Sequence, residues 1–223
     1  MNIKEFFEIR IIRIPNAKYQ RGFVWKEKQL KEFWDDLNQI TEIQGELTKH
    51  HFGTITLKEA NPEESEKWLV GYKFYNVVDG QQRLTTLCML LCELLRDSNN
   101  IFYGYSKTNL YKTFQYFKNT LGDKKIYKFS YATSHKNFNF LHHSIFENHL
   151  EPLNNDIKDD SLKNLVFAKK FFSEKILKLD DLQKRSLWKK ITTSLFLTIN
   201  SIEKDLDEEK VYRSINSRGV PLS

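Results

Sequence analysis

The fold depends on the stretch Val77-Val78-Asp79-Gly80-Gln81-Gln82-Arg83-Leu84-Thr85-Thr86-Leu87. The residues that lead into it, 69–78, are rich in β-branched and aromatic side chains, which favour a strand. The residues that follow, 84–95, are strongly apolar and contain neither Gly nor Pro, which predicts a buried helix. The sequence therefore predicts a polar turn at the point where a buried strand ends and a buried helix begins.

This turn has the chemistry of an anion site. Backbone N–H groups at the start of a helix have no intrahelical acceptor and favour a negatively charged ligand. Gly80 allows a ligand to approach the backbone closely, and Arg83 adds a planar, permanently charged guanidinium that suits phosphate. The turn therefore predicts a site for a ligand that carries phosphate.

A simpler interpretation gives these residues structural roles only. Asp79 would cap the helix, Gly80 would make the turn, and Arg83 would pair with a nearby acid. Two features favour function instead. Gln81 and Gln82 are neutral amides that a simple turn does not need. An Arg in the first helical turn also faces the positive end of the helix dipole, which is unfavourable unless an anion is shared.

The composition is that of a globular protein. The chain of 223 residues and 26.7 kDa allows one domain, or a core with an extension, and 40% of its residues are hydrophobic. Its two cysteines, Cys88 and Cys92, lie four residues apart in the predicted helix and are expected to be reduced core residues. No signal peptide or transmembrane stretch is apparent. We therefore expect a cytoplasmic protein without a membrane partner.

The formal charge of +6 is unevenly distributed along the chain. Residues 1–100 hold 14 Lys and Arg against 15 Asp and Glu, whereas residues 101–223 hold 21 against 14. Between Lys107 and Lys136, seven Lys residues are interleaved with Tyr and Phe, and this segment contains one acid, Asp123. Such a mixture can bind a nucleic-acid backbone and stack on bases, so DNA is an expected partner. The alternative is a lysine-rich surface that is simply solvated.

Before the turn, a short strand is predicted at residues 10–15, followed by the loop 16–25. In this loop we assign Phe23 and Trp25 to the core and predict that Tyr19, Gln20 and Arg21 belong to the site. Helical spacing then continues from residue 26 to about 44. A strand is expected at 51–57, where Gly53 predicts a bulge or a close backbone approach.

After the turn, the spacing of Leu110, Phe114, Phe117 and Leu121 predicts a helix, and further helices are expected at about 161–178 and 180–190. A late strand is predicted at 194–202 and a helix at 207–215. The chain then enters a polar loop, 216–223, that contains a second guanidinium, Arg218. We expect from this ending that the chain is a piece of a longer protein. The six His residues match no recognised metal spacing.

Several of these segments together resemble one protein family: the N-terminal domain of GmrSD-type modification-dependent restriction endonucleases, which also occurs in phosphorothioate-sensing anti-phage proteins. The resemblance covers the chain from end to end, and its most specific part is the Asp-Gly-Gln-Gln-Arg block. The segments that carry it are Ile14-Pro15, Tyr19-Gln20-Arg21-Gly22-Phe23-Val24-Trp25, Phe52-Gly53, Asp79-Gly80-Gln81-Gln82-Arg83-Leu84-Thr85-Thr86-Leu87 and Asn216-Ser217-Arg218-Gly219.

The resemblance implies an α+β fold. Its core would be a small mixed sheet with helices, similar to ParB and sulfiredoxin, with a mainly helical extension. We accordingly expect a nucleotide-binding core at residues 1–97, a basic helical extension at 98–192, and a strand and helix at 193–223 that return to the core. The resemblance further implies binding and hydrolysis of a nucleoside triphosphate, usually with Mg²⁺, as the regulatory step of a modification-dependent restriction or anti-phage system.

The site residues implied by the resemblance fall into two groups. The resemblance leaves open which group polarises the attacking water; our hypotheses are Asp79 or Gln82, with Arg83 stabilising the charge that develops on the phosphate. The predicted nucleotide-binding residues are Tyr19, Gln20, Arg21, Gly80, Gln81, Thr85, Asn216, Ser217 and Arg218. No protein ligand set for a resident metal is predicted. The resemblance also implies a C-terminal nuclease domain or a partner subunit, because members of the family normally continue into a helical region and often an HNH nuclease domain. None of the six His residues in this chain forms a nuclease motif, so DNA cleavage is not located here.

Two alternatives stay open at this point. The same polar cluster could belong to a non-catalytic module that binds DNA or senses modified DNA, or to an interaction scaffold whose nucleotide pocket has decayed. DNA binding through Lys and Arg should weaken steeply with salt, whereas nucleotide turnover should depend more on the divalent metal. The intact Gln81-Gln82-Arg83 run argues against a decayed pocket.

Overall fold

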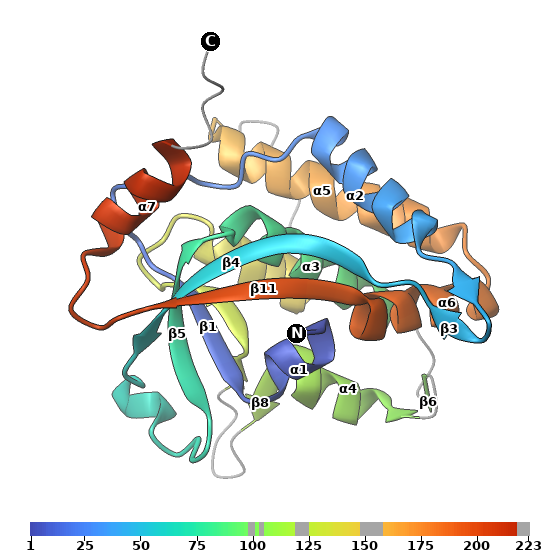
Figure 1. The fold of residues 1–223 in the computed structure, drawn as a ribbon, viewed down its shortest axis with the longest axis horizontal. Helices are drawn as coiled ribbons and strands as arrows, with labels where there is room; N and C mark the ends of the chain where they lie inside the picture. Colours follow the sequence, from blue (N-terminus) through green and yellow to red (C-terminus); the bar gives the residue numbers. More distant parts are fainter. Residues whose placement is uncertain (98–100, 103–104, 119–124, 148–157, 218–223) are drawn as a thin grey trace.

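A computed structural model describes residues 1–97, 101–102, 105–118, 125–147 and 158–217 (Figure 1). Its centre is a five-stranded mixed sheet in the order β10-β1-β5-β4-β11. The bounds are β1 Arg10–Ile14, β4 His50–Ala60, β5 Lys73–Asp79, β10 Phe129–Tyr131 and β11 Leu195–Ile202. Strand β1 runs parallel to β10 and to β5, β4 runs antiparallel to β5, and β11 runs parallel to β4. This confirms the predicted α+β class with a mixed sheet.

Helices cover one face of the sheet as a layer. Figure 1 shows α2 (Glu27–Gln39) and α5 (Asp160–Leu177) above the long strands β4 and β11, and α3 (Gln81–Arg96) contacts α5. Helix α3 is buried along nearly its whole length, because most of its side chains from Leu84 to Leu95 are apolar. On the other side, α1 (Ile3–Glu8) contacts α4 (Lys107–Phe114). One hydrophobic cluster joins side chains from all of these helices.

The remaining elements are short, except α6 and α7. They are β2 Glu42–Ile43, β3 Glu46–Leu47, the 3-10 helix η1 Glu64–Glu66, β6 Ile101–Phe102, β7 Tyr105–Ser106, β8 Tyr116–Lys118, β9 Lys125–Tyr127, the π-helix η2 Phe140–Phe146, α6 Asp181–Lys189, the π-helix η3 Lys190–Ser194 and α7 Glu208–Ser217. Region 98–192 holds α4, α5 and α6 together with the short strands β6 to β9, and its strand β10 pairs with β1 in the central sheet.

Gly53 behaves as its place in the predicted strand indicates. The pairing of β4 with β11 shifts by one residue between Phe196 and Leu197, whose partners are His51 and Gly53. Phe52 is therefore the extra residue of a β-bulge, and Gly53 adopts a positive φ of 117°. Both predicted features, the bulge and a close approach at Gly53, are present, because the side chain of Arg83 lies against its Cα.

Three predictions about helix ends are wrong. Helix α2 ends at Gln39, short of the predicted end near residue 44, and Glu42 and Ile43 form β2 instead. Helix α4 ends at Phe114, and Phe117 lies in β8, whose hairpin with β9 competes with helix formation; Leu121 lies outside the described residues. Asn216 and Ser217 lie in the last turn of α7 rather than in a loop. There the Asn216 amide donates to the Tyr212 carbonyl at 2.9 Å and the Ser217 hydroxyl donates to that of Ser214, which satisfies carbonyl groups at the helix end.

Candidate functional site

The predicted strand-turn-helix forms where β5 meets α3. Asp79 is the last residue of β5, and Gly80 is the N-cap of α3 with a left-handed φ of 93°. A Cβ on Gly80 would collide with the Ile55 side chain and lie 3.2 Å from the Thr54 carbonyl oxygen. The turn therefore requires glycine for two reasons: its backbone conformation and its contact with β4.

The start of α3 is not capped by any side chain. The first hydrogen bond within the helix runs from the Leu84 N–H to the Gly80 carbonyl at 3.1 Å. No side chain at the N-cap accepts a hydrogen bond from the N–H groups of the first turn. Within the described chain, the Asp79 carboxylate makes no hydrogen bond or ion pair, and Arg83 forms no ion pair. The structural interpretation in which Asp79 caps the helix and Arg83 pairs with an acid is therefore wrong.

The two glutamines attach the loop 16–25 to this helix start. The Gln82 amide donates to the Gly22 carbonyl at 2.9 Å and accepts from the Val24 N–H at 2.9 Å, so both ends of the amide are occupied. Gln81 donates to the Arg21 carbonyl at 2.6 Å. Its carbonyl oxygen is buried and has no hydrogen-bond partner among the described residues. In this arrangement Gln82 positions the loop; a part in polarising water would require it to release one of its bonds.

The Arg83 side chain reaches strand β4. Its Nη1 donates to the Thr54 carbonyl at 3.3 Å, and its Nε lies only 2.7 Å from where a Cβ on Gly53 would stand. The bulge at Gly53 therefore makes the room that the guanidinium occupies. Because that hydrogen bond is long and the guanidinium has five donors, most of its donors remain available for a ligand.

These residues surround a cavity of about 180 Å³. This volume lies below the roughly 300–1,000 Å³ of sites that enclose a whole drug-sized ligand. The cavity thus has the dimensions of a group such as phosphate, and the remainder of a nucleotide would extend beyond it. The lining residues are Arg21, Val24, Trp25, Asp79, Gly80, Gln81, Gln82, Arg83, Tyr212 and Asn216.

Other predicted site residues lie elsewhere. Thr85 is fully buried, with its hydroxyl 3.0 Å from that of Tyr131, so it does not reach the cavity. Gln20 donates to the Val77 carbonyl. Tyr19 donates to Glu208 at 2.8 Å, and Ser217 is exposed beyond the cavity wall. Arg218 lies outside the described residues.

The structure adds wall residues that the sequence did not indicate, above all Tyr212. It lies one helical turn before the predicted site residue Asn216, so the i, i+4 spacing on α7 could have identified it. Val24 and Trp25 also line the cavity, although Trp25 packs against the core as expected. Nothing in the sequence indicates that Gly53 lies against the Arg83 side chain; this contact is evident only from the fold.

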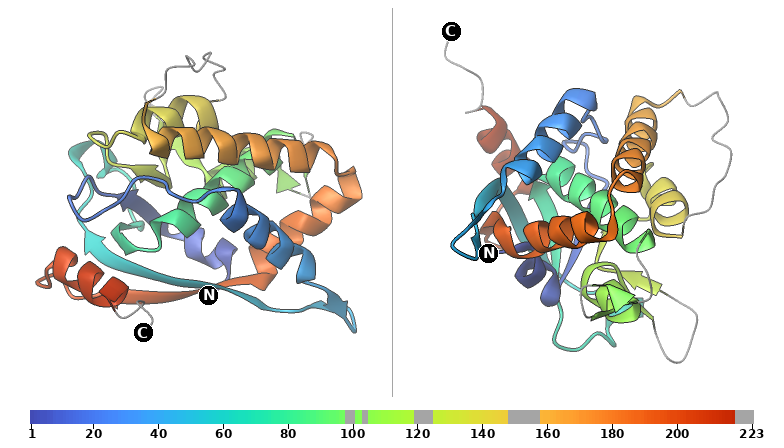
Figure 2. Two further views of the ribbon diagram at one scale, coloured as in Figure 1. Left: turned by 90° about the horizontal axis from the view of Figure 1, so that it is seen from above. Right: turned by 90° about the vertical axis from the view of Figure 1, so that its right-hand side faces the viewer.

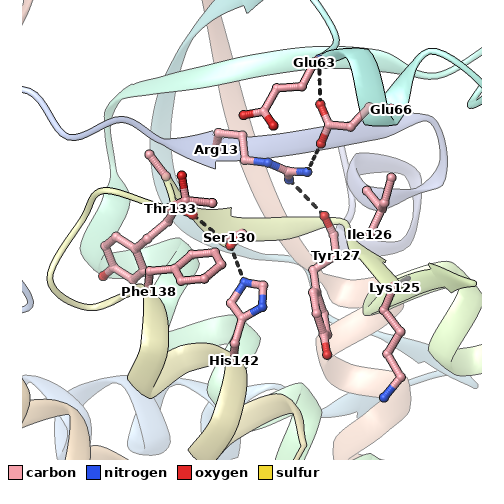
Figure 3. A pocket seen from close by; sticks show the side chains of 12 residues that line it. Arg13, Glu63, Glu66, Lys125, Ile126, Tyr127, Ser130, Thr133, Phe138 and His142 are labelled. Atoms are coloured by element: carbon pink, nitrogen blue, oxygen red, sulfur yellow. Dashed lines mark hydrogen bonds and ion pairs between the residues drawn. The ribbon is translucent and has the colours of Figure 1, made fainter. Parts of the chain in front are cut away.

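A second cavity, of about 130 Å³, lies beside β1 and β10 (Figure 3). Its buried polar groups pair with one another. Arg13 forms an ion pair with Glu66 and donates to the Tyr127 carbonyl at 2.9 Å, and the Ser130 hydroxyl lies 2.7 Å from His142 Nε2. Buried polar groups that are already satisfied gain little from a ligand. The uncapped turn of α3 is therefore the better candidate site.

Metal ligands are sparse in the described structure. Within the described ranges no group of three or more His, Cys, Asp and Glu side chains is arranged to hold a metal ion. The cavity at α3 contributes one carboxylate, Asp79. Among the helices of the same ranges, none is long and apolar enough to cross a membrane.

Comparison with known proteins identifies the family. No match was found among curated proteins. A model of the N-terminal domain of the GmrSD restriction endonuclease matches residues 3–223, essentially the whole chain. The match includes both sides of the cavity, the β5-α3 turn and helix α7. The chain therefore belongs to the family of GmrSD restriction endonuclease N-terminal domains and is a component of a restriction system.

Proposed function

We propose that the cavity at the start of α3 binds the phosphate groups of a nucleoside triphosphate and that the domain hydrolyses it. One observation carries this proposal. The uncapped first turn of a buried 16-residue helix opens into a cavity that is also lined by Arg21 and Arg83. Free N–H groups, the positive end of a helix dipole and two guanidinium groups all favour a multiply charged anion.

The proposed roles follow from the position of each group. The N–H groups of the first turn of α3 and the Arg83 guanidinium hold phosphate oxygens, and Arg83 stabilises the negative charge that grows during transfer. Asp79 has no partner in the described chain and faces the same cavity, so it is our candidate for orienting the attacking water. Gln81 and Gln82 hold the loop that carries Arg21 against the helix.

Mg²⁺ fits this donor set as a cation that binds together with the nucleotide. Magnesium is commonly bound through one or two carboxylates, several waters and the phosphates of the substrate, and Asp79 would supply the carboxylate. When bound, the metal would neutralise phosphate charge and align the phosphate chain. The protein contributes no dedicated cage in its described part, so we expect Mg²⁺ to enter with the nucleotide.

In this proposal the domain is regulatory. Family membership implies a partner nuclease domain and DNA as the target of the system. Nucleotide hydrolysis would control attack on modified DNA by that nuclease. The excess of Lys and Arg in residues 101–223 supports direct contact of this domain with DNA. The alternative is a module that senses DNA without hydrolysing nucleotides.

Phosphate release from ATP, GTP, CTP and UTP with Mg²⁺, with and without DNA, tests the proposal. Arg83→Ala should lower turnover by about 10²- to 10³-fold, the usual effect of removing a group that stabilises transition-state charge. Arg185→Ala is the matched control, because Arg185 is exposed on α6 and does not line the cavity. It should leave turnover in the absence of DNA unchanged.

The outcome separates the two functions. Turnover that needs Mg²⁺ and is lost in Arg83→Ala supports the hydrolase. Absence of turnover and of nucleotide binding by calorimetry, together with DNA binding that falls steeply with salt, would favour the DNA-sensing alternative. An equal loss of turnover in Arg83→Ala and Arg185→Ala would show that turnover depends on the overall positive charge and not on this site.

A further inference from the structure

Helix α7 lies on the body of the protein without a hydrophobic anchor. It contacts β5, yet none of its ten residues is buried. Val211 and Tyr212 are half-buried, and Ile215 keeps 38% of its surface exposed. Figure 2 shows α7 at one end of the sheet, apart from α5 and α6. Because a helix of this length is marginal by itself in water, specific contacts must hold it in place.

Those contacts converge on Glu208 in the first turn of α7. The Tyr19 hydroxyl donates to Glu208 Oε2 at 2.8 Å, and Lys58 Nζ lies 3.8 Å from Glu208 Oε1. Lys58 also donates to the Leu206 carbonyl at 2.8 Å, just before the helix. The side chains of Lys58 and Glu208 are only 19% and 21% exposed, so water weakens their attraction less than in a surface pair. The rings of Tyr19 and Tyr212 add a contact at 5.2 Å.

The same contacts connect α7 to the cavity. Tyr19 belongs to the loop 16–25, which Gln81 and Gln82 attach to the first turn of α3. Tyr212 and Asn216 of α7 form one wall of the cavity, whereas Tyr19 does not line it. The cavity is therefore complete only while α7 is docked.

We propose that Tyr19 is a positioning residue and not a nucleotide contact: through Glu208 it docks α7 as a cover on the cavity. The importance of this cover for ligand binding rests on the proposed function. If α7 leaves the body, the cavity loses the wall formed by Tyr212 and Asn216 while the α3 turn and Arg83 stay in place. Affinity for the ligand then falls in proportion to the fraction of molecules with α7 docked.

Protonation supports this arrangement. Burial, and then the hydrogen bond to Glu208, raise the pKa of Tyr19 above its usual range. The hydroxyl therefore stays protonated near neutral pH and remains a donor to the carboxylate.

Hydrogen exchange on the ligand-free protein tests the docking contact directly. Tyr19→Phe removes only the hydroxyl and should speed exchange of the amides of residues 208–217 about tenfold, with α3 and β5 unchanged. Tyr75→Phe is the matched control, because the Tyr75 hydroxyl makes no hydrogen bond within the described structure. Unchanged exchange in α7, or a rise spread over the whole chain, would overturn the proposal.

Kinetics then distinguish positioning from chemistry. Tyr19→Phe should raise KM for the nucleotide severalfold with little change in kcat, because saturating ligand selects the docked state again. Arg83→Ala should lower kcat. A fall in kcat at unchanged KM in Tyr19→Phe would mean that Tyr19 acts on the reacting phosphate, against our inference. Since the exchange test needs no ligand, a protein that binds no nucleotide would refute the proposed function while the exchange result still decides the role of Tyr19.

Discussion

Arg83 lies directly over the Cα of Gly53, so that a Cβ at residue 53 would stand 2.7 Å from its Nε and 3.1 Å from its Cζ. The two residues are 30 positions apart in the sequence, yet the need for glycine at position 53 and the position of the Arg83 guanidinium depend on each other. The bulge in β4 turns Gly53 to a positive φ and clears a space, and the guanidinium fills that space at the edge of the cavity. A glycine in a strand thus positions the charged group of the candidate site.

Gly53→Ala should therefore abolish ligand binding through Arg83. The new methyl group must displace the guanidinium, and a non-glycine residue at this φ costs about 1–3 kcal/mol of stability. We expect nucleotide affinity to fall as far as it does in Arg83→Ala, measured by calorimetry beside a urea unfolding curve. Gly45→Ala is the control, because Gly45 also has a positive φ of 84° but no atom lies within 4 Å of the position that a Cβ would take there. That variant should lose stability alone; equal affinities in both variants would refute the steric argument.

The Gln82 amide should hold the loop 16–25 in place. Gln82→Glu keeps an acceptor for the Val24 N–H but turns the donor towards the Gly22 carbonyl into a second acceptor. We expect local destabilisation of about 1–2 kcal/mol, the effect of a broken hydrogen bond with a repulsive contact, and faster exchange of the Val24 amide. Gln39→Glu, at an exposed position near the end of α2, should leave that amide unchanged. Unaltered exchange in Gln82→Glu would show that other contacts hold the loop.

The Arg13–Glu66 pair beside the second cavity should be a structural contact. The Glu66 side chain is 7% exposed, and the pair joins the 3-10 helix η1 to β1. Removing the Glu66 charge leaves the buried Arg13 with only the weaker attraction of Glu63, so Glu66→Gln should cost up to about 3–5 kcal/mol in urea unfolding. Glu32→Gln, which breaks an exposed pair with Lys28, should cost less than about 1 kcal/mol. Small effects from both variants would mean that solvent reaches Arg13 after Glu66 is changed.

The β5-α3 turn was predictable from the sequence because its signals are local. A run of β-branched residues predicts the strand, one glycine predicts the turn, and an uninterrupted apolar run predicts the helix. All three signals lie within a short stretch of chain, and the turn forms as expected. The loop residue Arg21, which the local sequence assigns to the site, lines the cavity. These predictions needed no knowledge of long-range packing.

Other features depend on contacts that no local pattern contains. Thr85 follows the turn closely, but the rotation of α3 points it at Tyr131 in the core. Tyr19 has the polar tip of a ligand contact, and its partner Glu208 is 189 residues away in the sequence. Phe117 fits a helical pattern, but pairing between β8 and β9 prevails over it. In each of these three cases, contacts in the folded protein decide where the side chain lies, and the local sequence pattern does not.

His142 should make the protein sensitive to mild acid. Burial, and then the charge of Arg13, lower the pKa of the imidazole from 6.5 to about 4; Glu147 opposes this shift and His143 adds to it. Between pH 6.5 and 4 the unfolded chain thus binds a proton that the folded chain excludes. Stability contributed by neutral His142 is present above pH 6.5 and is lost as pH falls towards 4, by at most about 1.4 kcal/mol per pH unit.

Two substitutions separate this titration from the hydrogen bond that the ring makes. His142→Gln removes the titrating group but can still bond the Ser130 hydroxyl, so its unfolding free energy should fall less than that of the wild type between pH 6.5 and 4. His142→Phe should show the same shallow pH dependence at lower overall stability, because the buried Ser130 loses a partner. Urea unfolding at several pH values measures both effects. Curves that run parallel to the wild type would show that His142 binds its proton equally well in the folded and unfolded protein, and that the acid sensitivity resides in other groups.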